Sequence, residues 1–232
     1  RSRGLGDVYK RQVYDGNTTA TLSGTRALTS GAATSADGKF VTNDVVSLTG
    51  TAAGAFADAN VANGINVAVS GLSLTGTDAS NYTLNGLNLS ANITARPITL
   101  TSNAVTKVYG NTDPTLGYSV EASSTGRGLV AGDSFSGSVA RVAGENVGSY
   151  AINQGTVANS NYNITWVANN LAITARPITL TANAVTKVYG DSDPTLGYSV
   201  EALGASRGLV AGDSFSGLSL IHISEPTRPR LI

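Results

Sequence analysis

One long segment occurs twice in this chain, first from Ile93 and again from Ile173. Residues 93–137 read ITARPITLTSNAVTKVYGNTDPTLGYSVEASSTGRGLVAGDSFSG, and residues 173–217 read ITARPITLTANAVTKVYGDSDPTLGYSVEALGASRGLVAGDSFSG. Of the 45 aligned positions, 38 are identical. A long fixed period predicts a tandem array of one structural unit, so each unit must fold beside copies of itself.

The two ends of the chain can be read as one DNA segment on opposite strands. Asp7–Gln12 can be coded GAT GTG TAT AAG AGA CAG, whose reverse complement codes Leu218–Ile223. Codons for Ser2–Gly6 likewise reverse into codons for Ser224–Arg228. The segment resembles the transposon-end adapter used to prepare sequencing libraries. We assign residues 1–12 and 218–232 to translated adapter and leave them out of the fold prediction; the alternative is a natural basic arm and tail.

The charge balance changes when these ends are set aside. The chain has 15 basic and 15 acidic residues, of which the ends carry six and two. The remainder therefore has 9 basic and 13 acidic residues, a formal charge of −4. No basic patch is visible, so the sequence predicts no nucleic-acid partner.

Two reactive residue types are almost absent. Cysteine does not occur, and the one histidine, His222, lies in the tail assigned to adapter. Disulfides, thiol catalysis, cysteine-based zinc sites and Ser-His-Asp triads are therefore not expected. No run of about 18 apolar residues occurs, so no membrane-spanning helix is predicted.

The composition and the alternation of side chains predict short strands. Charged residues are 13% of the chain, and Thr, Val, Asn and Gly dominate, which disfavours helices. Large side chains recur on one face of several short segments, which predicts half-buried strands. The recurring side chains are Ile98/Leu100, Tyr118/Val120, Phe135/Val139, Tyr150/Ile152, Tyr162/Ile164/Trp166 and Leu171/Ile173. Six or seven such strands in about 80 residues predict an all-β fold of antiparallel β-sandwich modules. We expect Trp166 and the tyrosines at 109, 118, 150 and 162 in the core, with a ligand platform as the alternative.

Short sequence motifs that recur along the chain divide it into modules. Val13-Tyr14-Asp15-Gly16, Val108-Tyr109-Gly110 and Val188-Tyr189-Gly190 mark similar positions in successive units. The predicted modules are residues 13–95, residues 96–176 and a truncated copy at residues 177–217. No glycine or serine run separates the modules, so we expect the last strand of one module to pass almost directly into the first strand of the next. Pro177 is expected to interrupt the hydrogen-bond ladder at the second of these joints.

Sites for chemistry are few. Asp191 and Asp193 form a carboxylate pair, but the matching positions of the other copy are Asn111 and Asp113, which argues against catalysis. Asp113, Asp133, Asp193 and Asp213 could bind Ca²⁺ in oxygen-rich turns, although aspartates that bond their own turn backbone are the favoured interpretation. We therefore predict no catalytic residue, no cofactor and no metal site.

The ordered motifs resemble two domain families of bacterial giant adhesins. Residues 13–20 (VYDGNTTA), 54–58, 69–76 and 81–84 are similar to the YDG domain. Residues 107–110 (KVYG), 113–114, 128–133 (GLVAGD), 143–150 and 161–162 are similar to the MBG domain of YGX type. The resemblance covers nearly all of residues 13–217. It implies tandem Ig-like modules in a filamentous-haemagglutinin-like adhesin, exported to the surface of a Gram-negative bacterium, and it transfers no catalytic residue.

Two function classes follow. The first is a stalk or spacer whose partners are neighbouring repeats of the same chain. The second is a module that itself binds a host or bacterial surface glycan, mucin or protein. The near-identity of the two copies favours the stalk, because a stalk depends on the length of its array, whereas binding modules would be expected to differ in their surfaces. An enzyme is not expected.

Overall fold

The computed structural model describes residues 11–23, 27–28, 30–31, 39–85 and 88–215. The adapter prediction falls largely outside them, since residues 1–10 and 218–232 are not described. Strands β1 to β16 make up the regular structure of the described residues, with one 3-10 turn at Ala79–Asn81 and no α-helix. The all-β prediction is confirmed. The chain forms two compact units, residues 1–102, 117–140 and 153–168 in the first and residues 103–116, 141–152 and 169–232 in the second.

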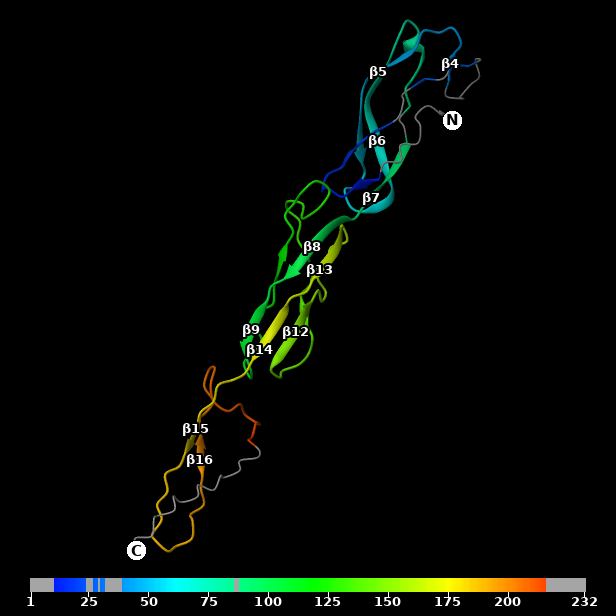
Figure 1. Cartoon of the computed structure of the whole chain (residues 1–232). Helices are drawn as coiled ribbons and strands as arrows, with labels where there is room; N and C mark the ends of the chain where they lie inside the picture. The colour runs from blue at the N-terminus through cyan, green and yellow to red at the C-terminus, as the bar shows by residue number, and fades with distance from the viewer. Residues whose placement is uncertain (1–10, 24–26, 29, 32–38, 86–87, 216–232) are drawn as a thin grey trace, which may run out of the picture. The chain divides into compact units, whose positions relative to one another are not determined.

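The first unit opens with a five-stranded sheet (Figure 1). Its spatial order is β1-β7-β6-β5-β2. Its strands are β1 (Gln12–Val13), β2 (Thr19–Ala20), β5 (Ser47–Phe56), β6 (Ala62–Thr75) and β7 (Asn88–Thr94). All neighbours run antiparallel except β1 and β7, which are parallel. A separate parallel pair joins β3 (Ser30–Gly31) and β4 (Phe40–Val41).

A second sheet of the first unit follows with almost no connection. Only Ala95 separates β7 from β8 (Arg96–Ser102), as predicted for a direct joint. Strand β8 lies between β10 (Tyr118–Val120) and β13 (Tyr162–Val167), in the order β10-β8-β13. Phe56, Val67 and Ile93 of the first sheet belong to the same buried cluster as Ile98 and Leu100 of the second. The two sheets therefore share one hydrophobic core.

The second unit holds a four-stranded sheet and a short strand pair. The sheet has the order β11-β12-β14-β9, with β9 (Val105–Val108), β11 (Ala140–Arg141), β12 (Gly148–Asn153) and β14 (Asn170–Thr174). Ile152, Leu171 and Ile173 are at most 2% exposed and form its core. Strands β15 (Leu180–Ala182) and β16 (Tyr198–Val200) pair antiparallel in the truncated third module, residues 177–217. Pro177 lies between β14 and β15, outside both ladders, as predicted.

The alternation of side chains identified much of the core, but not all of it. Val120, predicted to face inward, is 37% exposed, and the predicted core tyrosines 109, 118 and 150 are only partly buried. Ile98, Leu100, Ile152, Leu171 and Ile173 are all buried, as predicted. Tyr162 is 6% exposed, and Trp166 packs half-buried against the core, with its ring 5.8 Å from that of Tyr118.

The predicted strand direction was partly wrong. Strands β13 and β8 run parallel, as do β14 and β9, so the sheets are mixed rather than antiparallel. A parallel pair requires a long crossover, and residues 103–161 supply it between β8 and β13. The alternation of side chains shows which face of a strand is buried, but it does not show whether neighbouring strands run parallel or antiparallel. The described residues do not show the predicted Ig-like sandwich.

Leu100 and Leu180, which occupy the same position in two copies of the repeat, allow a matched test of the core. Leu100 is fully buried, whereas Leu180 is 41% exposed. We expect Leu100→Ala to lower the free energy of unfolding of the first unit by about 3 kcal/mol, and Leu180→Ala to cost less than about 1 kcal/mol. Urea unfolding followed by far-UV circular dichroism reports on both variants, and the fluorescence of Trp166, which pairs with Leu100 across β13 and β8, reports on the first unit alone. Equal losses in the two variants would contradict the assignment of the core.

Candidate functional site

The joint between the five-stranded sheet and β8 is built around a buried arginine. Arg96 opens β8 and is 6% exposed. Its Nε donates to the carbonyl of Gly128 at 2.7 Å, and its Nη1 donates to that of Tyr14 at 3.1 Å. Its Nη2 donates to the carbonyls of Ser124 and Arg127, both at 2.6 Å. The guanidinium thus joins a segment far upstream in the sequence to a loop downstream of it.

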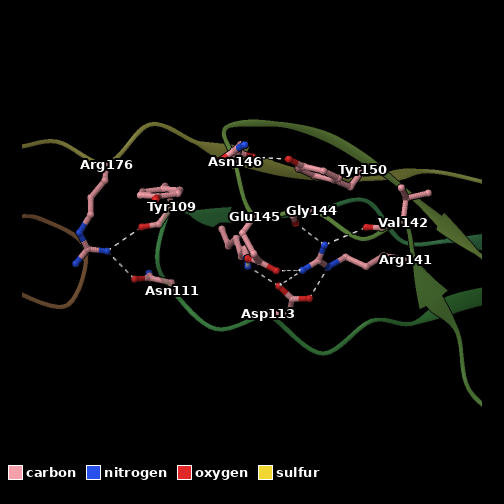
Figure 2. Close-up of polar contacts among 11 residues, drawn as sticks. Tyr109, Asn111, Asp113, Arg141, Val142, Gly144, Glu145, Asn146, Tyr150 and Arg176 are labelled. Atoms are coloured by element: carbon pink, nitrogen blue, oxygen red, sulfur yellow. Dashed lines mark hydrogen bonds and ion pairs between the residues drawn. The ribbon is translucent and has the colours of Figure 1, made fainter. Parts of the chain in front are cut away.

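The same arrangement recurs at the next joint, inside the second unit. Arg176 donates from Nε to the carbonyl of Gly208 at 3.0 Å and from Nη1 to that of Tyr109 at 3.0 Å. Its Nη2 donates to the carbonyls of Arg207 and Gly204. Figure 2 shows Arg176 facing Tyr109 and also Asn111, whose Oδ1 accepts a further bond at 2.9 Å. Arg176 and its three downstream acceptors occupy the same positions of the repeat as Arg96 and its own.

Two loops complete each joint. We call Tyr14–Gly16 and Tyr109–Gly110 the tyrosine loops, and Gly128–Asp133 and Gly208–Asp213 the GLVAGD loops. The hydroxyl of Tyr14 donates to Oδ1 of Asp133 at 3.3 Å, and that of Tyr109 donates to Oδ1 of Asp213 at 3.2 Å. Each tyrosine loop therefore bonds to the GLVAGD loop of the copy that follows it.

The loops approach so closely that only glycine fits. A Cβ on Gly16 would lie 2.9 Å from Cγ1 of Val130, and a Cβ on Gly110 would lie 2.5 Å from Cγ2 of Val210. Both glycines also have a positive φ, 80° and 79°, which L side chains rarely adopt. The two joints thus share their steric fit as well as their hydrogen bonds.

In the first unit a second tyrosine closes the joint. The hydroxyl of Tyr162 donates to Oδ2 of Asp133 at 2.5 Å and accepts from the backbone N–H of Val130 at 3.0 Å. Its ring packs edge-on against Tyr14, with centroids 5.6 Å apart, and lies 5.3 Å from Phe135. Burial, followed by the bond to Asp133, raises the pKa of Tyr162 to about 12, and burial likewise raises the pKa of Tyr14. Both phenols therefore remain protonated donors at neutral pH.

A four-residue ion network lies beside the second joint (Figure 2). Nζ of Lys107, whose side chain is 4% exposed, lies 2.6 Å from Asp113 and 2.5 Å from Glu145. Arg141 pairs with the same two carboxylates, through Nε to Asp113 at 2.5 Å and through Nη2 to Glu145. The bonds from Arg141 and then Lys107 lower the pKa of Asp113 to about 2. Two cations and two anions balance, so the buried ammonium is compensated.

The structure assigns each of the four candidate calcium ligands to a protein partner. Asp113 and Asp193 pair with Lys107 and Lys187, and Asp133 and Asp213 accept bonds from tyrosines. No group of three acidic or histidine side chains suited to a metal occurs among the described residues. The favoured interpretation, aspartates bonding their own turns, missed these side-chain partners, of which the lysines lie six residues away and the tyrosines more than 100.

The arginines of the joints were also missed. Both copies of the repeat contain the segment Ile-Thr-Ala-Arg-Pro-Ile-Thr-Leu, in which apolar side chains alternate with others. Arg96 and Arg176 are its charged residues. A charge repeated at a strand position beside buried side chains is the signal that could have identified them.

The family comparisons agree with the sequence motifs. Residues 98–172 and 178–228 match the model of the MBG domain (YGX type), and residues 6–89 match that of the YDG domain. Both MBG matches begin just after a joint arginine. The matched ranges extend into residues 6–12 and 218–228, whose adapter origin stays a prediction. No curated protein and no solved structure matches the chain. In the part of the chain that is described, no helix is long and apolar enough to cross a membrane.

Arg96 and its neighbour Arg127 provide a matched test of the joint. Arg96→Ala leaves four carbonyls without their donor, so we expect the free energy of unfolding of the first unit to fall by about 3 kcal/mol. Arg127→Ala removes a half-exposed pair with Glu121 and a 3.4 Å bond to Oγ1 of Thr99, and should cost less than about 1 kcal/mol. Arg96→Lys should recover part of the loss, because one ammonium has three donors. Urea unfolding measures all three, and equal losses for Arg96→Ala and Arg127→Ala would refute the role of the joint.

Asp113 predicts a dependence of stability on pH. Its pKa is about 2 in the folded protein against 3.8 ordinarily, so its contribution is complete above about pH 4 and is lost as the pH falls towards 2. We expect Asp113→Asn to lower the melting temperature at pH 6, and the difference from the parent chain to shrink between pH 4 and 2. Asp193→Asn is the matched control, because Asp193 is 83% exposed. A pH-independent difference for Asp113→Asn would contradict the ion network.

Proposed function

The chain belongs to the MBG domain (YGX type) family, with a YDG domain ahead of its MBG repeats, and we propose that it is a stalk segment of a large bacterial adhesin. Both domains are typical of repetitive bacterial surface proteins. The stalk would be secreted or exposed on the outer surface of a Gram-negative bacterium. Its partners would be the neighbouring repeats of the same chain, with no nucleic-acid partner, no membrane-spanning segment and no enzymatic role.

The observation that carries this proposal is the repeated joint. Arg96 and Arg176 make equivalent bonds to the preceding tyrosine loop and to the following GLVAGD loop. A stalk requires that successive modules be held in one defined way, however many are added. A buried guanidinium with several fixed acceptors supplies this, because bending the joint would break several bonds together.

The proposal also accounts for where the two copies are alike. The GLVAGD loop and the Ile-Thr-Ala-Arg-Pro segment, which build the joints, are identical in both copies. A module selected to bind varied ligands would be expected to keep its core and vary its surface loops. Here a surface loop is kept, and it is the loop that receives the neighbouring module.

Single-molecule force spectroscopy on the full chain tests the stalk role. We expect the parent chain to resist extension until its units unfold, and Arg96→Ala to lower the unfolding force of the first unit, since the joint then lacks its central donor. Arg127→Ala should leave that force nearly unchanged.

A ligand screen on the same chain tests the alternative. We expect no saturable binding to host glycans or mucin. A micromolar interaction that is abolished by a surface substitution, together with an unfolding force insensitive to Arg96→Ala, would favour a binding module instead.

A further inference from the structure

The YDG domain contains a tyrosine clasp built like the one that closes the joint of the first unit. The hydroxyl of Tyr82 donates to Oδ2 of Asp44 at 2.5 Å and accepts from the backbone N–H of Val41 at 2.8 Å. At the joint, the hydroxyl of Tyr162 makes the same two bonds to the GLVAGD loop, at 2.5 and 3.0 Å. In both clasps one phenol thus holds the two ends of a Val-x-x-Asp turn.

The backbone of the two clasps is also alike. In each turn the aspartate N–H donates to the carbonyl of the valine three residues earlier, at 3.1 Å in both. The residue before the aspartate has a positive φ, 81° at Asn43 and 91° at Gly132. Tyr82 and Tyr162 lie 80 residues apart, in identical Ser-Asn-Tyr segments, and the N–H of each bonds the carbonyl three residues earlier. Val41–Asp44 is therefore the counterpart, in the YDG domain, of the last four residues of the first GLVAGD loop.

At the first joint, the turn held by Tyr162 receives the preceding module. Oδ1 of Asp133 accepts from the hydroxyl of Tyr14, while Tyr162 bonds Oδ2. The side chain of Val130 lies so close to Gly16 that a Cβ there would be 2.9 Å from it. One carboxylate thus bonds a tyrosine of each module, and the valine three residues earlier fits against the incoming loop.

Asn161, the residue before Tyr162, makes a further contact with the preceding module. It is 9% exposed. Its Nδ2 donates to Oδ1 of Asn60 at 2.8 Å, and its Oδ1 accepts from the backbone N–H of Val61 at 3.0 Å. Asn60 and Val61 lie in the connection between β5 and β6 of the YDG domain. Both polar atoms of this amide therefore bond the preceding module.

The YDG domain has counterparts of all three contact residues. We call them the receiving surface, and they are Val41, Asp44 and Asn81. Tyr82 bonds Oδ2 of Asp44, the same oxygen that Tyr162 bonds on Asp133. The receiving surface thus has the same residue types, held by the same hydrogen bonds, as the surface that the YDG domain itself contacts at the first joint.

We propose that the receiving surface binds the tyrosine loop and the Asn-Val turn of a module placed ahead of the YDG domain. The incoming phenol donates to Oδ1 of Asp44, the glycine of its loop packs against Val41, and Asn81 bonds the Asn-Val turn. A YDG domain can then follow a module as well as precede one. The partner is a neighbouring module of the same array, so the inference rests on the stalk function proposed above.

Both types of module in this chain carry the groups that such a partner needs. The MBG module has a tyrosine loop at Tyr109–Gly110. It also has an Asn-Val pair at Asn146–Val147, in an Ala-x-x-Asn-Val segment like that of residues 57–61. An MBG module therefore fits the receiving surface as well as a second YDG domain does.

A chain with an MBG module ahead of its YDG domain tests the proposal. In this variant residues 96–187 replace residues 1–12, so that a complete MBG module and a joint arginine precede Val13. Hydrogen exchange measured by mass spectrometry is compared with the parent chain at residues 40–46, which occur once in both chains. We expect exchange there to slow at least about fivefold, the factor that corresponds to one net hydrogen bond.

One substitution, placed in either of two modules, makes the result specific. Tyr109→Phe in the added module removes the hydroxyl that would bond Asp44, and it should reverse most of the protection at residues 40–46. The same substitution in the original module removes a bond to Asp213 and should leave that protection unchanged.

Three outcomes would overturn the proposal. These are unchanged exchange at residues 40–46 in the extended chain, protection that persists with Tyr109→Phe in the added module, and equal effects of that substitution in the two modules. The stalk function is judged separately, by the response of the unfolding force to Arg96→Ala. A negative exchange result with a force-sensitive Arg96 therefore rejects the receiving surface alone, and the reverse combination rejects the stalk alone.

Discussion

The fold depends on how two cations, the buried Arg96 and the half-buried Arg176, are held without carboxylate partners in their hydrogen bonds. Removing a guanidinium from water is costly unless every donor direction is satisfied. Here backbone carbonyls provide nearly all the compensation, and they come from both the preceding and the following copy. Neither the tyrosine loop nor the GLVAGD loop alone could solvate the charge. Each joint is therefore complete only when two successive modules are both folded around it.

This use of carbonyls explains where the repeat tolerates change. Ser124 and Gly204 occupy equivalent positions and differ in side chain, yet each contributes its carbonyl to the arginine. Tyr14 belongs to a YDG domain and Tyr109 to an MBG domain, and each likewise contributes a carbonyl and a hydroxyl. The joint therefore requires from the preceding module only a correctly placed backbone carbonyl and one tyrosine hydroxyl, and does not depend on the rest of that module's sequence. Either domain can therefore precede an MBG repeat.

The sequence predicted the parts of the structure that depend on residue type. The period of two identified Ile98, Leu100, Ile152 and Leu171 as core, because burial of alternate side chains leaves a pattern in the chain itself. It did not predict that β13 and β8 run parallel, since direction is set by the crossover rather than by local pattern. It also missed the role of Arg96, because carbonyl acceptors exist at every residue and carry no signature of their own.

The truncated module, residues 177–217, shows that the arginine contacts of a joint are separable from its tyrosine contacts. The Arg176 anchor is present there although the described residues contain no counterpart of β13. The two sets of contacts span similar distances along the chain: Arg176 bonds Gly208, 32 residues away, and Tyr162 of the first unit bonds Asp133, 29 residues away. Loop-closure entropy therefore does not separate them. The guanidinium contacts do not require the tyrosine strand, whereas the phenol of that strand bonds the same GLVAGD loop that the arginine contacts.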